Sequence, residues 1–381
     1  MAAPLPIPAA RHAADGFLAS VQPHQLVYFL CNVGDGDSQV ILLPEDAGGR
    51  RRVVVVDVAT VGKVPALISA LETAGLLASA QPDPNGSPDG SIALVVATHP
   101  HSDHIGGMAE LLADQAARIA EFWDPGYFHT TQGYHQMMAA VEANPHLAYA
   151  QPTAGYKRWI GPALVTVLSP AVWLRNRFDT YGTQINDSSI SLRVEFPAAR
   201  VIQRGAGREL IDAPNTMALI LGADAQTLSW SYVLTDFPEL HPSGSAAAKA
   251  IKAATGSDQL RARVLKVSHH GSKNGVNLEL VARINPALTL ISNAAPSTHG
   301  FPHGVAQELI REALEAQASN PNAVRSLDCD LGIFYTSDQD DAGDFLGSMA
   351  VVMGRGRAAL WRFYDRENQV INFANARRWA G

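Results

Sequence analysis

The chain has 381 residues, 47% of them hydrophobic, and a formal net charge of −7. This composition allows a large core in one large domain or two small ones, and it argues against a broadly basic nucleic-acid-binding surface. With only Cys31 and Cys329, no disulfide framework is expected, and a reducing compartment is predicted. No signal peptide is recognised, and no apolar run approaches the roughly 18 residues of a membrane span. We therefore expect a cytoplasmic protein without membrane association.

The first third of the chain is expected to form strands and helices around one loop. Residues 1–24 are rich in Pro and Ala and are predicted to be a loose lead-in to a single domain over residues 25–381. Apolar, β-branched runs predict strands at residues 27–33, 39–43 and 52–57. Helical spacing of apolar residues predicts a helix over residues 64–71, and the polar stretch near residues 78–91 is expected to be an insertion.

The stretch Thr98–Gly107 lies where a buried strand is expected to end and a helix to begin. The apolar run 92–97 predicts the strand, and apolar residues from Met108 onward recur at helical spacing. Four groups that commonly bind zinc and related divalent ions lie within six residues of this loop: His99, His101, Asp103 and His104. A solvated polar loop is the alternative, but the strand-then-helix context favours a site for two adjacent metal ions.

Further strands and helices are predicted after this loop. Helices are expected at residues 136–141, 246–254 and 305–316, and strands at residues 164–169, 189–196, 216–224, 263–267, 287–293, 331–335, 349–353 and 358–363. Polar and apolar residues alternate over 189–196, so this strand is expected to be half exposed. A polar insertion near 198–215 carries arginines that suit either a phosphate-binding rim or a solvated surface: Arg200, Arg204 and Arg208.

Two metal ions need more ligands than one loop supplies, and a carboxylate at the end of a later strand can bridge them. Asp224 ends the apolar run 216–224, whereas its rival Asp236 follows a shorter run, so Asp224 is favoured. His269 and His270 follow another β-branched strand. One of them can bind a metal ion while the other protonates a leaving group, and we assign His270 to the metal and His269 to the substrate.

The loop at 99–104 resembles the His-x-His-x-Asp-His signature of the metallo-β-lactamase fold superfamily. This resemblance implies that His99 and His101 bind one metal ion, while Asp103 and His104 bind the second. Four further segments look, in this order, like the hydrolase domain of the DNA-uptake channel ComEC and its freestanding relatives: 32–38, 186–189, 222–225 and 265–272. That likeness covers about residues 27–310. It implies an αββα sandwich of two mixed sheets with helices on both outer faces, and it implies hydrolysis of phosphodiesters as the activity.

The sequence departs from the family pattern in several places, one of which is Ala223-Asp224 where the family has Gly-Asp. Residues 34–37 read Gly-Asp-Gly-Asp instead of Gly-Gln-Gly-Asp, and Asp35 and Asp37 are interpreted as turn residues. Residues 299–303 correspond to a Tyr-Gly-His-Pro-like element of the family but lack its central histidine. His303 is a candidate to take the place of that histidine. The Gly-His-Thr element of the lactamase and lactonase branches is missing. The first metal ion would therefore have His99, His101 and Asp224, together with solvent or a group from the turn at Asn186 and Asp187. The membrane channel is absent as well.

The predicted function is that of a dinuclear hydrolase, with zinc or manganese as the two ions and a bridging hydroxide as the nucleophile. The substrate is predicted to be a phosphodiester in a nucleic acid or nucleotide. Asp103 and His269 are the expected catalytic residues, Asp57 is expected to orient the metal loop, and the substrate is expected to contact His269, Ser272, Asn186 and His303. His129 and His135 are interpreted as structural. Two alternatives stay open: an ester, thioester or lactone hydrolase, and a non-catalytic module with structural metal ions.

Overall fold

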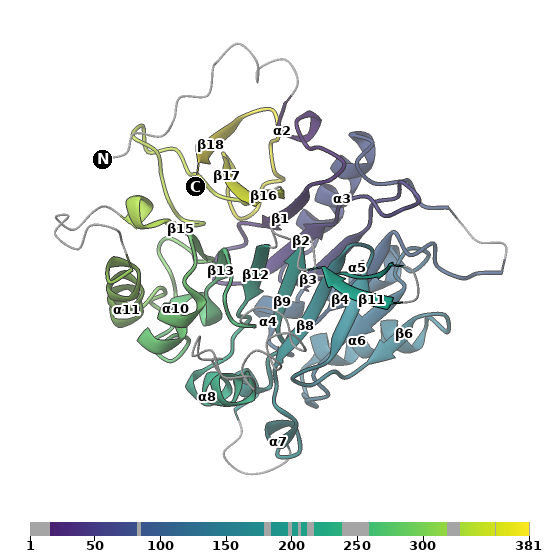
Figure 1. Cartoon of the computed structure of the whole chain (residues 1–381), viewed down its shortest axis with the longest axis horizontal. Coiled ribbons are helices and arrows are strands. Elements are labelled where there is room, and N and C mark those ends of the chain that lie inside the picture. Colours follow the sequence, from purple (N-terminus) through teal and green to yellow (C-terminus); the bar gives the residue numbers. More distant parts are fainter. Residues whose placement is uncertain are drawn as a thin grey trace.

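The computed structural model describes residues 16–81, 85–178, 184–196, 200–204, 207–211, 217–237, 259–317, 328–354 and 356–380. Within these residues, two mixed β-sheets lie face to face, and helices cover the outer side of each sheet (Figure 1). The predicted sandwich of two mixed sheets between layers of helices is therefore confirmed.

The first sheet has nine strands, and its order places late strands beside early ones. β1 (Leu26–Leu30) pairs antiparallel with both β16 (Met349–Gly354) and β2 (Ser38–Leu42). From β3 onward the strands run parallel to one another. Beyond β2 follow β3 (Val53–Val58), β4 (Ile92–Val96), β5 (Glu121–Trp123) and β6 (Ala148–Ala150), and beyond β16 follow β17 (Arg357–Phe363) and β18 (Ala376–Ala380).

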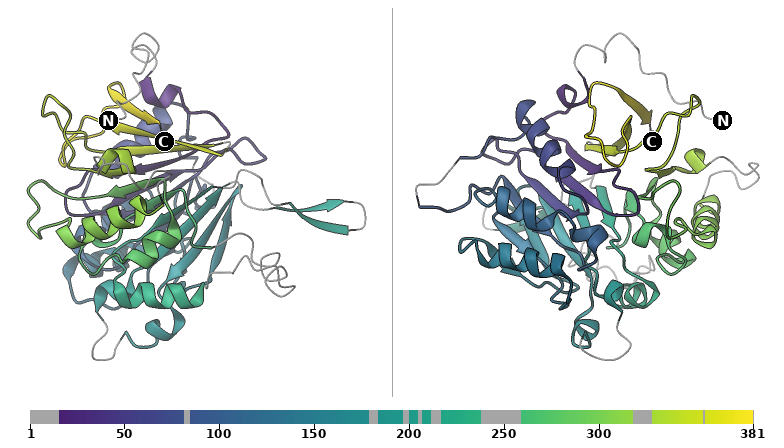
Figure 2. Two further views of the ribbon diagram at one scale, coloured as in Figure 1. Left: turned by 60° about the vertical axis from the view of Figure 1, so that its left-hand side comes forward. Right: turned by 180° about the vertical axis from the view of Figure 1, so that it is seen from behind.

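The second sheet has seven strands and is parallel at one end only. Its order is β15 (Ile333–Tyr335), β14 (Leu288–Ile291), β13 (Val264–Lys266), β12 (Met217–Leu221), β9 (Ser191–Phe196), β8 (Ala163–Ser169) and β7 (Lys157–Ile160). A separate hairpin, β10 (Arg200–Arg204) with β11 (Gly207–Ile211), projects from the body of the molecule (Figure 2). Part of the predicted loop at 198–215 is thus a hairpin.

Three apolar clusters separate the layers. One lies between the two sheets, and the others lie between each sheet and its helices. The first sheet is covered by α3 (Lys63–Thr73), α5 (Met108–Asp114) and α6 (Gln132–Glu142), and the second by α8 (Thr227–Asp236), α10 (Leu278–Ile284) and α11 (Gly304–Glu315). Because both faces of each sheet are covered, strands such as β4 are apolar throughout rather than alternating.

Shorter helical turns connect these elements: α2 (Gly16–Ala19), α4 (Ser102–Ile105), α7 (Val172–Arg175), η1 (Ile185–Ser188), η2 (Ser268–Gly271) and η3 (Asp328–Leu331). The lead-in is shorter than predicted, because Phe17 in α2 and Val21 are buried in the first core cluster. Residues 1–15 and the predicted helix at 246–254 lie outside the described part of the chain. Within the described residues, no helix has both the length and the apolar character needed to span a membrane.

Two strand predictions were wrong for identifiable reasons. β9 is buried except at Glu195, although half exposure was expected, because it pairs with β8 and β12 and both faces of the sheet are covered. The apolar run 232–235 before Asp236 is not a strand but part of α8, where Trp230 and Val233 form one buried face. A short apolar run cannot distinguish a strand from the buried side of a helix.

Candidate metal centre

The candidate site lies where strands of both sheets end. β4 of the first sheet leads into the loop with the first histidines, while β12 and β13 of the second sheet lead to Asp224 and to the pair His269 and His270. The predicted helix after the metal loop is divided into α4 and α5 by Gly106 and Gly107. A Cβ at either glycine would collide with the backbone of Ala59 or Thr60, so the loop can lie against β3 only with glycine there.

Two groups of side chains that share Asp224 have ligand atoms close enough to hold a metal ion, all within 4.8 Å of one another, and a third such group is Asp37, Asp57 and His104. The first group is His99, His101 and Asp224, and the second is Asp103, His104, Asp224 and His270. His99, His104 and His270 are buried, whereas the Asp103 side chain is 42% exposed and opens the site to solvent. These are the six residues that the sequence proposed as ligands.

Asp224 belongs to both groups, with one oxygen facing each. Its Oδ1 lies 3.2 Å from His104 Nε2 and 3.6 Å from His270 Nε2, while its Oδ2 lies 3.7 Å from His99 Nε2. Gly222 allows this approach because a Cβ there would collide with Ser268. The rival Asp236 ends α8 and belongs to no metal-binding group found among the described residues.

The residues present fit a bound metal. His104 Nε2, His270 Nε2 and Asp224 Oδ1 are buried and have no hydrogen-bond partner among the described residues. Buried polar atoms without a partner are rare and costly, and these three converge on one point. Imidazole nitrogens and a carboxylate oxygen are ligands that zinc and manganese accept, so a divalent cation would satisfy all three atoms.

His104 is oriented by a carboxylate of the first sheet. Asp57, at the end of β3, has its Oδ2 2.8 Å from His104 Nδ1, and it also accepts hydrogen bonds from the backbone and the hydroxyl of Thr98. Since Nδ1 is engaged in this way, Nε2 is left to face Asp224. Asp57 thus occupies the place that its predicted orienting role requires.

His270 is oriented by a longer chain of contacts. Its Nδ1 lies 2.9 Å from Ser292 Oγ, and this hydroxyl donates to Asp37 Oδ1 at 2.6 Å. The other oxygen of Asp37 forms an ion pair with Lys266, and both side chains are fully buried. Asp37 is therefore more than the turn residue that the sequence suggested. Lys266 and Ser292 were missed, although a lysine inside the apolar strand 263–267 is a visible signal.

Burial and neighbouring charge set the protonation of the ligands in the metal-free site. Burial holds the pKa of His99 well below its ordinary value and lowers the pKa of His270, so both are neutral imidazoles with a free lone pair. Burial acts in the same sense on His104, but the carboxylates of Asp224 and Asp57 raise its pKa well above the ordinary value. Binding of a cation would displace the proton that His104 holds.

His269 occupies the outer side of the site. Its backbone is left-handed, with φ of 50°, and its side chain is 17% exposed. Nε2 lies 3.6 Å from Asp224 Oδ2 and 3.4 Å from Asn186 Nδ2, while Nδ1 lies 3.4 Å from Gln226 Nε2. The ring of Phe301 packs 5.3 Å away. Gln226 was not recognised in the sequence, since nothing local sets it apart, whereas Phe301 stands in the 299–303 element at the position of the missing histidine.

The other predicted residues lie farther from the ligands. Ser272 is buried, and its amide donates to His269 O at 2.7 Å. His303 is exposed and caps α11, because its Nδ1 accepts from the amide of Val305, and no described contact links its side chain to the ligands. The His129 ring lies 6.3 Å from His101, and His129 and His135 belong to neither group. The side chains of the arginines at 200, 204 and 208 lie outside the described part.

Comparison with known proteins gives one family and several distant structures. A family model described as the metallo-β-lactamase superfamily matches residues 36–183. No curated protein matches the sequence.

Among solved structures, the metallo-β-lactamase fold protein YhfI from Bacillus subtilis has 12% identity and a TM-score of 0.38, over 78% of this chain and 94% of that one. A B3 metallo-β-lactamase with an active-site glutamic acid has 13% identity and a TM-score of 0.30, over 76% and 91%. A long-form RNase Z from yeast has 10% identity and a TM-score of 0.33, over 71% and 38%.

Proposed function

We propose that this chain, which has the fold of the metallo-β-lactamase superfamily, is a dinuclear metal-dependent hydrolase that cleaves a phosphodiester. The observation that carries this proposal is Asp224, whose two oxygens face two separate groups of buried ligands. One ion would be held by His99, His101 and Asp224, and the other by Asp103, His104, Asp224 and His270. A carboxylate shared in this way is typical of two-metal hydrolytic sites.

Zinc or manganese ions bound there would supply an activated water and charge neutralisation for the scissile group. The protein itself supplies a proton donor, because His269 lies beside Asp224 and is open to solvent. Asn186 and Gln226 lie against its two ring nitrogens and fix its orientation, and Phe301 shields one side of the ring from water. From this position His269 can donate a proton to the leaving oxygen.

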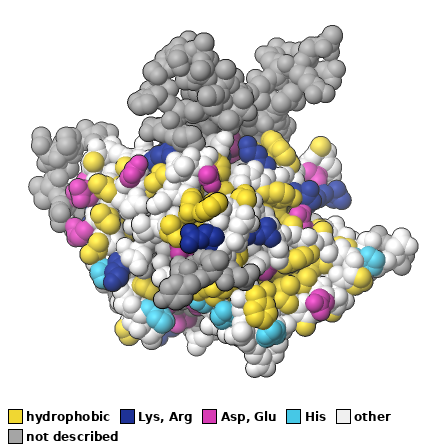
Figure 3. All heavy atoms as spheres, turned by 90° about the horizontal axis from the view of Figure 1, so that it is seen from below, with side chains coloured by type: hydrophobic (Ala, Val, Ile, Leu, Met, Phe, Trp, Pro, Cys, Tyr) yellow, Lys and Arg dark blue, Asp and Glu magenta, His cyan; other side chains and the backbone are white. Residues whose placement is uncertain are grey.

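The phosphodiester substrate is supported by the block 268–272, Ser-His-His-Gly-Ser, which resembles that of ComEC-type hydrolases, and by the missing Gly-His-Thr element. The proposal of a phosphodiester substrate gains no support from a basic surface patch. On the face seen in Figure 3, Lys and Arg side chains are scattered among hydrophobic ones and do not form a continuous patch. The proposal therefore rests on the metal centre and its immediate surroundings.

The proposal is tested with the full chain after chelation and reloading with zinc or manganese. We expect bis-p-nitrophenyl phosphate and at least one of single-stranded DNA, duplex DNA, RNA and cyclic dinucleotides to be hydrolysed by the reloaded protein only. Asp224→Ala should lose this activity, while Asp341→Ala, at an exposed aspartate without a described contact, should keep it.

Two results would replace the proposal. Hydrolysis of lactones or thioesters without any phosphodiesterase activity would identify an ester-type hydrolase at the same site. Two bound metal ions without turnover on either panel would indicate a metal-stabilised, non-catalytic module.

A further inference from the structure

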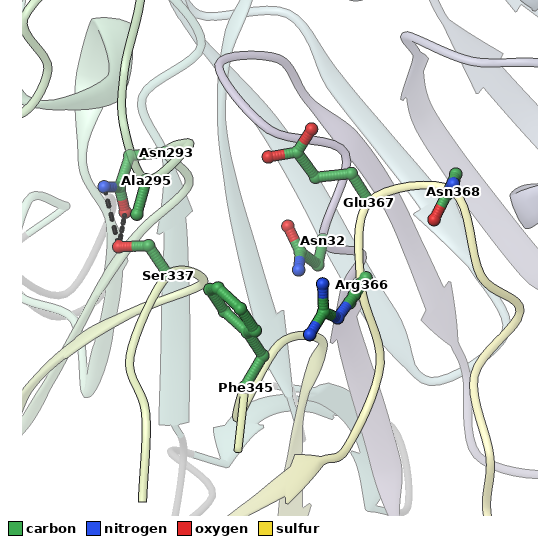
Figure 4. A pocket seen from close by; sticks show the side chains of 8 residues that line it. All are labelled: Asn32, Asn293, Ala295, Ser337, Phe345, Arg366, Glu367 and Asn368. Carbon is green, nitrogen blue, oxygen red and sulfur yellow. Dashed lines mark hydrogen bonds between the residues drawn. The ribbon is translucent and has the colours of Figure 1, made fainter. Parts of the chain in front are cut away.

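A second polar cavity, of about 310 Å³, lies at the edge of the molecule where β1, β14 and β15 end (Figure 4). Asn32 follows β1, Asn293 follows β14 and Ser337 follows β15. Phe345 and the exposed segment 366–368 complete the lining. The volume falls within the range of small-molecule sites.

The walls of this cavity are held in place independently of any ligand. Asn32 and Asn293 are buried, with 3% and 4% exposure. The amide of Asn32 donates to Ser348 Oγ at 2.8 Å, and the side chain of Asn293 exchanges hydrogen bonds with Ser337 Oγ (Figure 4). The side chain of Asn32 is paired as well, with the carbonyl of Asp365 and the amide of Gly34, so the groups that remain for a ligand are those of Phe345, Arg366, Glu367 and Asn368.

The charges of Arg366 and Glu367 are not neutralised within the described residues. Neither side chain forms an ion pair there, and the neighbouring Asp365 is occupied by Lys63, 2.7 Å away, and by Ser348. The Arg366 guanidinium lies 5.0 Å from the centre of the Phe345 ring. The Glu367 carboxylate rests against Gly34, where a Cβ would come within 3.0 Å of it. The cavity thus offers one cation, one anion and an aromatic surface.

This combination selects the ligand by elimination. A simple anion would be repelled by Glu367, a simple cation by Arg366, and an apolar molecule would leave both charges without partners. A nucleobase can stack on the aromatic surface of Phe345 while its edge presents acceptors to Arg366 and N–H donors to Glu367. Guanine offers O6 and N7 as acceptors, together with N–H donors on the same ring system.

The cavity and the metal centre share two segments of backbone. Ser292 contacts His270, while the next residue, Asn293, lines the cavity. The turn 32–38 connects them in the same way, because Asn32 lines the cavity and Asp37 supports His270 through Ser292. Asp35 joins the two segments by accepting from the amide of Ala294 at 2.8 Å.

We infer that this cavity is a nucleobase-binding site next to the metal centre, with guanine as the preferred base. The inference rests on the proposed function, in which the phosphate of a nucleotide or nucleic acid lies at the metal centre. The base can belong to the substrate itself or to a free nucleotide that regulates the enzyme. Both sources share the chemistry that the cavity recognises.

Calorimetric titration of the full, metal-free chain with guanosine tests the inference without requiring catalysis. We expect saturable binding of guanosine, weaker binding of uridine, and none of inorganic phosphate. Glu367→Gln keeps the size of the side chain and removes its charge, so it should weaken guanosine binding about tenfold, as expected for loss of a hydrogen bond to a charged group. Phe345→Leu should weaken it as well. Glu312→Gln, on the exposed side of α11, is the matched control and should bind like the wild type.

No guanosine binding at millimolar concentrations, or equal binding by Glu367→Gln and wild type, overturns the inference. Binding of free phenylalanine in place of guanosine would also overturn it, because a zwitterion could join the two charges instead. If guanosine raises KM for a phosphodiester, the base belongs to the substrate, and if it changes kcat alone, the ligand is a regulator. Guanosine binding without phosphodiesterase activity would contradict only the proposed function, and activity without guanosine binding would contradict only this inference.

Discussion

The two sheets support their innermost histidines in different ways. On the first sheet, Nδ1 of His104 contacts the carboxylate of Asp57, which comes from a strand beside the metal loop. On the second sheet, His270 contacts the hydroxyl of Ser292, and the charge behind it belongs to Asp37 of the first sheet. The first support is local, whereas the second spans both sheets. The orientation of His270 therefore depends on how the two sheets pack on each other, whereas the support of His104 by Asp57 does not.

The largest effect is expected from Lys266→Met, which leaves the fully buried Asp37 without its cation. Loss of one partner of a buried ion pair costs about 3–5 kcal/mol, and denaturant unfolding of the metal-free protein should show this loss. The double variant Asp37→Asn, Lys266→Met should recover most of it, because an uncharged pair leaves no buried charge. A loss below about 1 kcal/mol in the single variant would mean that the pair behaves like an exposed one.

Asp57→Asn tests the local support. The amide can still accept from Thr98, but it no longer offers a carboxylate to His104 Nδ1. Removal of such a partner typically lowers metal affinity about 10- to 100-fold, which competition with a coloured chelator can measure. The protein should stay folded in the metal-free state. Unchanged metal affinity would show that His104 needs no carboxylate to hold its orientation.

Ser292→Ala tests the relayed support and should have a smaller effect. The backbone carbonyl of Ser292 lies 3.2 Å from His270 Nδ1 and can replace the lost hydroxyl as acceptor. We expect metal affinity to fall by less than about tenfold, in line with the loss of one neutral hydrogen bond. A fall as large as that of Asp57→Asn would indicate that the two supports are equivalent.

The smallest change in the free energy of unfolding is expected at an exposed ion pair. This change is the reference against which the loss at the buried pair is compared. Arg50 and Asp46 lie 3.7 Å apart, and the Arg50 side chain is 66% exposed. Arg50→Gln should change the free energy of unfolding by no more than about 1 kcal/mol, because solvent screens the pair. The same denaturant experiment as for Lys266→Met measures it, so the ratio of the two losses reports the effect of burial.

The parts of the site that could be predicted from the sequence are those with a local pattern. His99 to His104 lie on one loop between a strand and a helix, and Asp224 ends a long apolar strand, so residue type and position were sufficient. The contact between Asp37 and Lys266 joins residues that are 229 positions apart, and no periodicity connects them. Only the packing of one sheet on the other brings them together.

The same limit explains the rest of the fold and the second cavity. The positions of the longer apolar strands followed from apolar runs, whereas β5, β6, β7, β18 and the β10–β11 hairpin were not predicted. The order of strands did not follow either, so the pairing of β1 with β16 could not be predicted. Exposure in β9 was misjudged because alternation says nothing about what covers the second face of a sheet. The lining of the cavity comes from four distant parts of the chain, near residues 32, 293, 337–345 and 366, and no sequence pattern links them to one another.

The position of β16 beside β1 has a consequence for how the protein is made. Asn32, just after β1, bonds to Ser348, 316 residues farther along the chain. Until the ribosome has released that segment, one edge of β1 has no partner, and an open strand edge is a template for pairing with other nascent chains. More chaperone during synthesis should therefore increase the yield of correctly folded protein.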